Sequence, residues 1–248
     1  MKIRKLKTNH LTNPIGNSIE PLTLSWVVDS DKATKQKSAR VEIASDAGFK
    51  NVVFDSGAKA GTDSLAYSPD FKPAKRTRYF WRVTVVADNG ETATAKAFFE
   101  TGKLDERWKA KWVTSPSNTE NKHFLLKKTF TLDDFSEARA YCSALGIYEL
   151  EVNGKAATEE VLLPGFHTYT LQMQAQTFDI TKLLHKGENT IGFHVGPGWY
   201  NSQLGWAQAG KYGETTAAIC EVRVKAGNSD KLVASTDDTW VCGQSPIV

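Results

Sequence analysis

The sequence is poor in cysteine, and no two of its cysteines are close neighbours along the chain. The three are Cys142, Cys220 and Cys242, an odd number at spacings that match no common metal site. A small secreted domain held by disulfides would have an even, closely spaced set, so that class of fold is not indicated. The pattern favours reduced thiols in a reducing compartment.

The sequence also lacks long apolar runs and a strong excess of one charge. No stretch is long enough to cross a membrane, and Met1 is followed by Lys-Ile-Arg-Lys-Leu-Lys without an apolar signal region. We therefore predict a cytoplasmic protein, or a secreted one if a leader has been removed. The net charge of +3 is too small to indicate nucleic acid or a membrane surface as a partner.

Motifs for catalysis and for cofactors are missing as well. The five histidines are dispersed, so no metal site is predicted, and there is no Gly-x-Ser-x-Gly elbow. Gly196-Pro197-Gly198 lacks the Lys and Ser/Thr of a phosphate loop. General acid catalysis needs a pocket that raises a pKa, whereas the paired carboxylates here are typical of a solvated surface: Glu149/Glu151, Glu159/Glu160 and Asp237/Asp238. We predict no catalytic residue, no metal and no cofactor in this chain.

The sequence does contain many short stretches with the two-residue period of β-strands. Tyr148, Leu150 and Val152 alternate with Glu149 and Glu151, which predicts a strand with one apolar face. Asn153-Gly154 then supplies the positive-φ residues of a tight hairpin turn. Helix is expected at most as a single turn at Thr181–Leu184. Further strands are predicted at residues 123–131, 139–143, 174–180, 189–195, 215–225 and 231–235, with a terminal piece near Trp240.

The first hundred residues have the same character. Trp26 and Trp81 occupy apolar positions of an early and a late strand, and residues 88–91 form a turn. This indicates a β-sandwich of the fibronectin III or immunoglobulin type, and the lack of a disulfide candidate favours fibronectin III. We therefore predict an all-β chain of two tandem sandwiches. The first spans residues 1–104, and the second, jelly-roll-like and of the carbohydrate-binding type, spans residues 105–248.

One loop after a predicted strand has the composition of a saccharide site. A sugar offers a C–H face that stacks on an aromatic ring and hydroxyls that pair with amides. The loop carries flat aromatic rings and amides: Trp199, Tyr200, Asn201, Gln203 and Trp206. The loop 164–169, with Phe166, His167 and Tyr169, is a candidate facing wall. The alternative is that Trp199 or Trp206 packs in a core or a domain interface.

Several motifs in a fixed order resemble those of a known family. In the second half they read Ala-Leu-Gly-Ile-Tyr-Glu-Leu-Glu-Val-Asn-Gly (144–154), Leu-Pro-Gly-Phe-His-Thr-Tyr (163–169), Phe-Asp-Ile-Thr-Lys-Leu-Leu (178–184), Gly-Glu-Asn-Thr-Ile-Gly (187–192) and Gly-Pro-Gly-Trp-Tyr (196–200). In the first half they include Asn13-Pro14-Ile15-Gly16, Tyr79-Phe80-Trp81-Arg82-Val83 and Phe99-Glu100-Thr101-Gly102. Together they resemble the N-terminal β-sandwich of bacterial α-L-rhamnosidases and the fibronectin-like domain that precedes it. The chain departs from the usual pattern at Phe166, where the family tends to have Trp, and at Pro197, where an acidic residue is common.

The resemblance implies a multidomain glycoside hydrolase acting on rhamnose-containing glycans or glycosides. Catalysis would lie in a later (α/α) toroid, where two carboxylic acids hydrolyse terminal α-L-rhamnosides with inversion. This chain would then be the accessory part, supporting that domain and binding carbohydrate. Two other readings stay open, namely a free-standing carbohydrate-binding or adhesion module, and a pair of rigid spacers. Continuation of the chain into an α/α domain would favour the enzyme.

Overall fold

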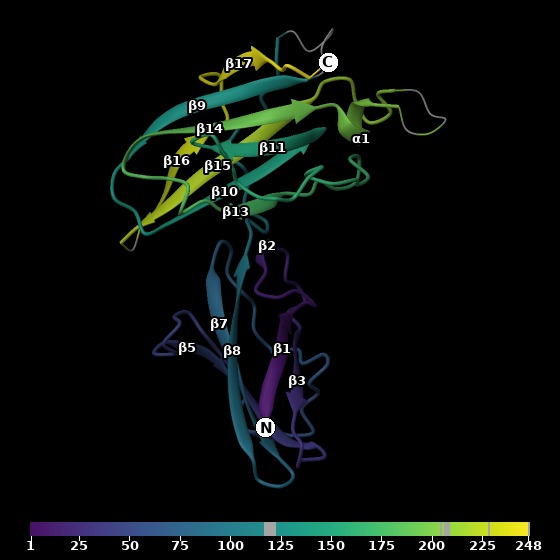
Figure 1. Ribbon diagram of the computed structural model, residues 1–248, viewed down its shortest axis with the longest axis vertical. Helices are drawn as coiled ribbons and strands as arrows, with labels where there is room; N and C mark the ends of the chain where they lie inside the picture. Colours follow the sequence, from purple (N-terminus) through teal and green to yellow (C-terminus); the bar gives the residue numbers. More distant parts are fainter. Residues whose placement is uncertain (117–122, 204, 206–208, 228, 248) are drawn as a thin grey trace. The chain divides into compact units, whose positions relative to one another are not determined.

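The chain was analysed as a computed structural model, which describes residues 1–116, 123–203, 205, 209–227 and 229–247. The chain divides into two compact units, Met1–Glu106 and Arg107–Val248. The regular secondary structure of both units is almost entirely β-strand (Figure 1). The predicted all-β class with tandem sandwiches is confirmed.

The first unit packs a small sheet against a larger one. The small sheet pairs β1 with β3, and the larger has the order β2-β8-β7-β4-β5, with β6 also paired to β4. All its ladders are antiparallel except β2 with β8. Its strands are β1 (Lys2–Thr8), β2 (Ile15–Asn17), β3 (Leu24–Asp29), β4 (Gln36–Ala44), β5 (Val52–Asp55), β6 (Lys59–Ala60), β7 (Arg78–Ala87) and β8 (Thr92–Thr101).

The core of the first unit contains the two tryptophans that the sequence places on strands. Trp26 of β3 and Trp81 of β7 are both fully buried. Each indole N–H has a partner, because Trp26 Nε1 donates to Gln36 Oε1 at 3.0 Å and Trp81 Nε1 donates to Thr8 Oγ1 at 3.2 Å. Burying an indole is favourable when its single polar group is satisfied in this way.

The second unit has a four-stranded and a five-stranded sheet, in the orders β13-β10-β15-β16 and β12-β11-β14-β9-β17. In Figure 1 the two sheets form its two layers. The elements are β9 (Phe124–Leu132), β10 (Glu137–Leu145), β11 (Ile147–Val152), β12 (Lys155–Ala156), β13 (Gln176–Asp179), β14 (Gly187–Gly196), α1 (Gly198–Asn201), β15 (Ala217–Ala226), β16 (Ser229–Ser235) and β17 (Val241–Gln244).

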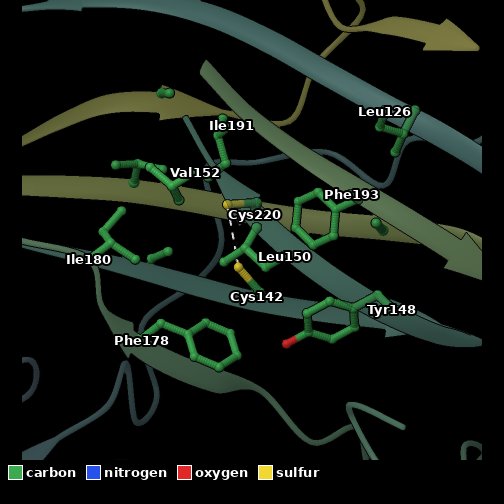
Figure 2. Close-up of a cluster of buried hydrophobic side chains, with 14 of the residues drawn as sticks. Leu126, Cys142, Tyr148, Leu150, Val152, Phe178, Ile180, Ile191, Phe193 and Cys220 are labelled. Atoms are coloured by element: carbon green, nitrogen blue, oxygen red, sulfur yellow. Dashed lines mark hydrogen bonds between the residues drawn. The ribbon is translucent and has the colours of Figure 1, made fainter. Parts of the chain in front are cut away.

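Apolar side chains from both sheets meet between the layers of the second unit. Leu150 of β11 and Phe193 of β14 come from one sheet, and Cys142 of β10 and Cys220 of β15 come from the other (Figure 2). On β11 the apolar positions are buried, whereas Glu149 is exposed. The alternation read from the sequence therefore predicted the buried face of this strand correctly.

The hairpin turn after β11 is confirmed, since Asn153 and Gly154 have φ of 51° and 73° and join β11 to β12. The single turn predicted at Thr181–Leu184 is present, since Leu184 N–H donates to the carbonyl of Ile180 at 3.3 Å, but the short helix α1 was not predicted. Residues 181–183 form a hydrogen-bonded turn, in which Leu183 N–H donates to the carbonyl of Ile180 at 3.0 Å. The α-helical turn is α1, because Pro197 has helical dihedrals and its carbonyl accepts from Asn201 N–H at 3.1 Å. Among the described residues, no helix is long and apolar enough to span a bilayer.

Candidate functional site

The two loops that the sequence marks as a saccharide site lie together in the second unit. The centroids of the Phe166 and Trp199 rings are 6.1 Å apart, with an interplanar angle of 68°. The Tyr169 ring lies 5.1 Å from the rings of both Tyr200 and Tyr212. We call this group the aromatic loop cluster: Phe166, His167, Tyr169, Trp199, Tyr200 and Tyr212.

The first of these loops is tied to the strands beside it. Tyr148 N–H in β11 donates to the carbonyl of Leu163 at 2.7 Å. The Gln176 side chain in β13 donates to the carbonyl of Pro164 at 3.1 Å and accepts from the Tyr148 hydroxyl at 2.9 Å. Because these bonds hold the start of the loop to two strands, Phe166 and His167 are presented at a defined place.

The helical turn α1 is placed by a close approach of backbone to side chain. Gly198 has a φ of 46°, and a Cβ there would lie 2.4 Å from Ile147 Cγ2. Only glycine fits both the dihedral angle and the space. Figure 1 shows α1 directly after β14. The Gly-Pro-Gly run therefore delivers Trp199 and Tyr200 beside β11.

Phe166 and Trp199 offer aromatic surface at the edge of the cluster. The Phe166 side chain is 55% exposed, although large apolar side chains are usually covered. Trp199 is half-buried and is not among the buried residues of the hydrophobic core. Two adjacent rings that are only partly covered form a surface on which the C–H face of a sugar can stack.

His167 lies beneath this surface and has an unused acceptor atom. Its side chain is only 5% exposed, and its ring lies 4.0 Å from that of Tyr169. Nδ1 is 3.1 Å from the carbonyl oxygen of Gly165. A carbonyl cannot donate, so Nδ1 carries the proton and Nε2 is left as an acceptor. Both His167 Nε2 and Tyr169 Oη are buried without a hydrogen-bond partner.

The protonation states of the cluster follow from its burial. Burial lowers the pKa of His167 below its usual value, which keeps the imidazole neutral. Burial raises the pKa of Tyr169, as do the neighbouring Tyr212 and Tyr200. Burial also raises the pKa of Tyr200. At neutral pH these groups are therefore uncharged, and the cluster offers neutral hydrogen-bonding groups rather than an ion.

The predicted amides lie in different surroundings. Asn201 is buried, and its Nδ2 donates to the carbonyl of Glu214 at 2.5 Å, so its side chain fastens α1 to a neighbouring loop. Gln203 is exposed, and its Nε2 lies 3.3 Å from the carbonyl oxygen of Gly205. Trp206 lies outside the described residues. The role of all three in sugar binding stays a prediction.

Two residues of the site were not found from the sequence. Tyr212 packs against Tyr169, and the Lys211 Nζ atom lies 5.6 Å from the Tyr212 ring centroid. Gly213 allows Tyr200 to approach, because a Cβ on Gly213 would lie 2.0 Å from Tyr200 Oη. Both residues belong to an irregular loop with no period, and the only signal was its content of Gly and Tyr.

The carboxylate pairs lie on the surface. On the outer face of β11, Glu151 is 3.6 Å from His194 Nε2 of β14. Glu159 and Glu160 are exposed, and the Asp237 carboxylate accepts from the Thr239 N–H at 2.9 Å. Within the described part of the chain, no three His, Cys, Asp or Glu side chains are grouped so as to hold a metal ion.

A hollow of about 180 Å³ lies at the outer face of the five-stranded sheet. Its wall is mostly apolar, with Ile147, Val161, Leu162, Val195 and Ile247, and also contains His123, Glu149 and His194. Its residues come from five segments that are distant in the sequence, so no local pattern indicated it.

Comparisons with known proteins agree with the predicted resemblance. Residues 133–248 match the family model "Alpha-L-rhamnosidase N-terminal domain", and residues 3–105 match "Rha78A-like, N-terminal immunoglobulin domain". An α-L-rhamnosidase of Formosa agariphila is 28% identical over 268 residues, which cover 97% of this chain and 29% of that protein. The chain therefore spans less than a third of the length of this curated relative.

Two solved structures have the same fold over almost the whole chain. The α-L-rhamnosidase from Dictyoglumus thermophilum is 24% identical with a TM-score of 0.86, covering 99% of this chain and 30% of that one. The α-L-rhamnosidase from Aspergillus terreus is 25% identical with a TM-score of 0.85, covering 98% of this chain and 29% of that one. Both family models and both structures thus identify the chain as resembling the N-terminal region of an α-L-rhamnosidase, an immunoglobulin-type domain followed by the α-L-rhamnosidase N-terminal domain.

Proposed function

We propose that this chain is the N-terminal accessory part of a glycoside hydrolase that releases terminal α-L-rhamnose, and that the aromatic loop cluster contacts carbohydrate. The names of the relatives support this enzyme class. These relatives are about three times as long as the segment that matches this chain. Catalysis is then assigned to the remaining length, in an (α/α) toroid where one carboxylic acid protonates the leaving oxygen and another activates water.

The observation that carries the carbohydrate contact is the exposed Phe166 ring beside Trp199, 6.1 Å away. Phe166 on a loop that is held by two strands, together with the half-buried Trp199 of α1, gives a stacking surface at low entropic cost. A sugar that stacks there would direct its polar edge toward the groups around the rings. Gln203 is the exposed amide among the candidates, and it offers both a donor and an acceptor.

The polar groups of the cluster favour a neutral ligand. His167 Nε2 accepts but does not donate, and the neutral imidazole supplies no charge. Nε2 itself is buried, so a ligand meets the ring surface rather than this atom, and the neutral rings offer no charge to a carboxylate or phosphate. We therefore expect the cluster to select neutral sugars over uronic acids.

The test is a calorimetric titration of the purified chain with L-rhamnose, with and without calcium, and with D-glucuronate as the anionic comparison. We expect a saturable signal for rhamnose only. Phe166→Ala should weaken binding about 2- to 12-fold, since an aromatic contact contributes about 0.5–1.5 kcal/mol. Leu171→Ala is the matched control, because Leu171 lies in the same segment between β12 and β13 and is 84% exposed.

If the folded chain shows no saturation up to high millimolar rhamnose, the proposed carbohydrate contact is wrong. The two sandwiches would then serve as a scaffold. The enzyme assignment is tested separately, by assaying the complete gene product for release of L-rhamnose from an aryl α-L-rhamnoside. Binding by this chain combined with no hydrolysis by the complete product would instead support a free-standing carbohydrate-binding module.

A further inference from the structure

Two cysteines that are distant in the sequence meet inside the second unit. Cys142 on β10 and Cys220 on β15 are 78 positions apart, yet they are directly opposite each other in the antiparallel ladder. Their Sγ atoms are 3.5 Å apart, and Figure 2 marks this contact with a dashed line. Both side chains are fully buried. The spacing along the chain gave no sign of this pairing.

The backbone around the two residues has the geometry that a disulfide needs. Cys220 N–H donates to Thr236 Oγ1 at 3.1 Å, and its carbonyl accepts from Thr236 N–H at 3.0 Å. Both groups therefore point away from β10, which makes Cys142 and Cys220 a non-hydrogen-bonded pair. Such pairs have Cα atoms about 4.5 Å apart. Disulfides span Cα separations of about 4.4–6.8 Å, so side-chain rotation brings the sulfurs within bonding distance without moving a strand.

The surroundings leave this pair isolated from other reactive groups. Figure 2 shows Leu150, Tyr148 and Phe193 around the two sulfurs. The third cysteine, Cys242, lies on β17 in the opposite sheet, where it pairs with Leu126 of β9. A bond between Cys142 and Cys220 would thus join strands that are already neighbours, whereas a bond to Cys242 would have to cross between sheets.

We propose that Cys142 and Cys220 are an oxidative modification site, at which a small-molecule disulfide installs a bond between β10 and β15 while the chain folds. One cysteine thiolate attacks the reagent and forms a mixed disulfide, and one small thiol leaves. The other thiolate attacks the protein sulfur of that mixed disulfide, and a second small thiol leaves. The reagent gains two electrons, and the two protons of the protein thiols end on the two small thiols.

Folding is the stage at which the bond forms, because the folded core protects the thiols. Burial raises the pKa of Cys142 well above its usual value, so the nucleophilic thiolate is scarce in the folded protein. The core also excludes the reagent. Protein that folds in a reducing compartment therefore keeps both thiols afterwards. The oxidation state of the pair then depends on the compartment in which the chain folded.

The bond would close a loop that contains the whole candidate site. Residues 143–219 lie between the two cysteines, and they include Phe166, His167, Trp199 and Tyr200. Closing a loop in the unfolded chain lowers its entropy and stabilises the folded state. The oxidised form should therefore hold the aromatic loop cluster on a more stable sandwich, whether or not that cluster binds sugar.

The test is to refold the chain with Cys242→Ala, which removes the third thiol, in either dithiothreitol or a mixture of glutathione and its disulfide. After oxidising refolding we expect a mass lower by two hydrogens, no free thiol and a proteolytic fragment linking the segments around Cys142 and Cys220. The thermal midpoint should lie above that of the reduced form. Reduced protein that is already folded should keep both thiols in the same mixture.

Single variants provide the matched comparison. Cys142→Ala and Cys220→Ala, each with Cys242→Ala, should show no difference in midpoint between the two refolding conditions. If they fail to fold, the mass and fragment map of Cys242→Ala alone decide. Folded protein with both thiols free, or with each bound to glutathione, would overturn the proposal. So would a linked form that melts below the reduced one, because the bond would then distort the native sheet.

Discussion

The two units differ in how completely their buried side-chain polar atoms are paired. In the first unit the indole N–H groups of Trp26 and Trp81 are each paired with a side-chain oxygen. In the second, His167 Nε2, Tyr169 Oη and Arg223 Nη1 are buried without partners, and among the described residues these are the side-chain atoms in that condition. Two of the three belong to one loop. The difference indicates a first unit built for stability and a second that gives up some stability at a candidate binding site.

Several charged side chains on the outer face of the first unit are also paired with hydrogen-bond partners. Arg82 makes two hydrogen bonds to the Glu42 carboxylate, at 2.6 and 2.8 Å, and Arg40 makes two to Asp55, at 2.9 and 2.6 Å. Bidentate pairs of this kind fix the orientation of both side chains. Among the described residues, the His167 ring instead lies against the Tyr169 ring and the carbonyl oxygen of Gly165.

The largest expected effect comes from the packed core of the first unit. Trp81→Ala would leave a cavity and should cost about 3–5 kcal/mol of unfolding free energy. Hydrogen exchange followed by mass spectrometry should show the loss in peptides of residues 1–106 and not in those of β9–β17. The control is Leu65→Ala, at a side chain 73% exposed, where the change should stay within about 0.5 kcal/mol. Equal loss in both units would contradict the view that each has its own core.

A matched pair of smaller substitutions tests the difference in polar satisfaction. Gln36→Leu would leave the buried Trp26 N–H without its acceptor and should cost about 1–3 kcal/mol. His167→Leu removes an imidazole whose Nε2 has no partner and should change stability by less than about 1 kcal/mol, since the lost bond to Gly165 is offset by relief of the unpaired atom. Chemical denaturation of both variants measures the two values. A cost for His167→Leu as large as that for Gln36→Leu would mean that Nε2 is satisfied in solution.

The smallest effect, a dependence on pH, should occur in separate ranges for the two units. The pKa of His167 is lowered in the folded state, so the unfolded chain takes up a proton first, and stability falls as the pH drops below about 6.5. The pKa of Asp55 is lowered to about 2, chiefly by its hydrogen bond from Arg40, so its contribution is complete above pH of about 4 and is lost on the way to about 2. Hydrogen exchange at pH 7, 5 and 3 should therefore show the second unit weakening first.

Two variants assign these ranges to single residues. His167→Gln should abolish the loss between pH 7 and 5, and His185→Gln, at an exposed histidine, is its control. Asp55→Asn should reduce the loss below pH 4. If the second unit of the His167→Gln variant still weakened between pH 7 and 5, another group would be responsible.

The sequence predicted strands such as β7, β11 and β14 because an apolar face alternates in each with a more exposed one. It also predicted the turn at Asn153-Gly154, since that dipeptide favours positive φ. It did not predict α1, because a turn of four residues has no period and depends on the tight contact of Gly198 with Ile147. The partners of Tyr169 and the pairing of Cys142 with Cys220 depend on segments brought together by the whole fold, which spacing along the chain does not reveal.

The order of the five-stranded sheet has a consequence for synthesis on the ribosome. β9, the first strand of the second unit, lies between β14 and β17, and β17 ends at Gln244. Until β17 has left the exit tunnel, one edge of β9 is open to pairing with other chains. All strands of the first unit have been synthesised by residue 101, so its sheets do not depend on a strand from the end of the chain. During translation the nascent chain therefore carries a finished first sandwich beside a second one that is still one strand short.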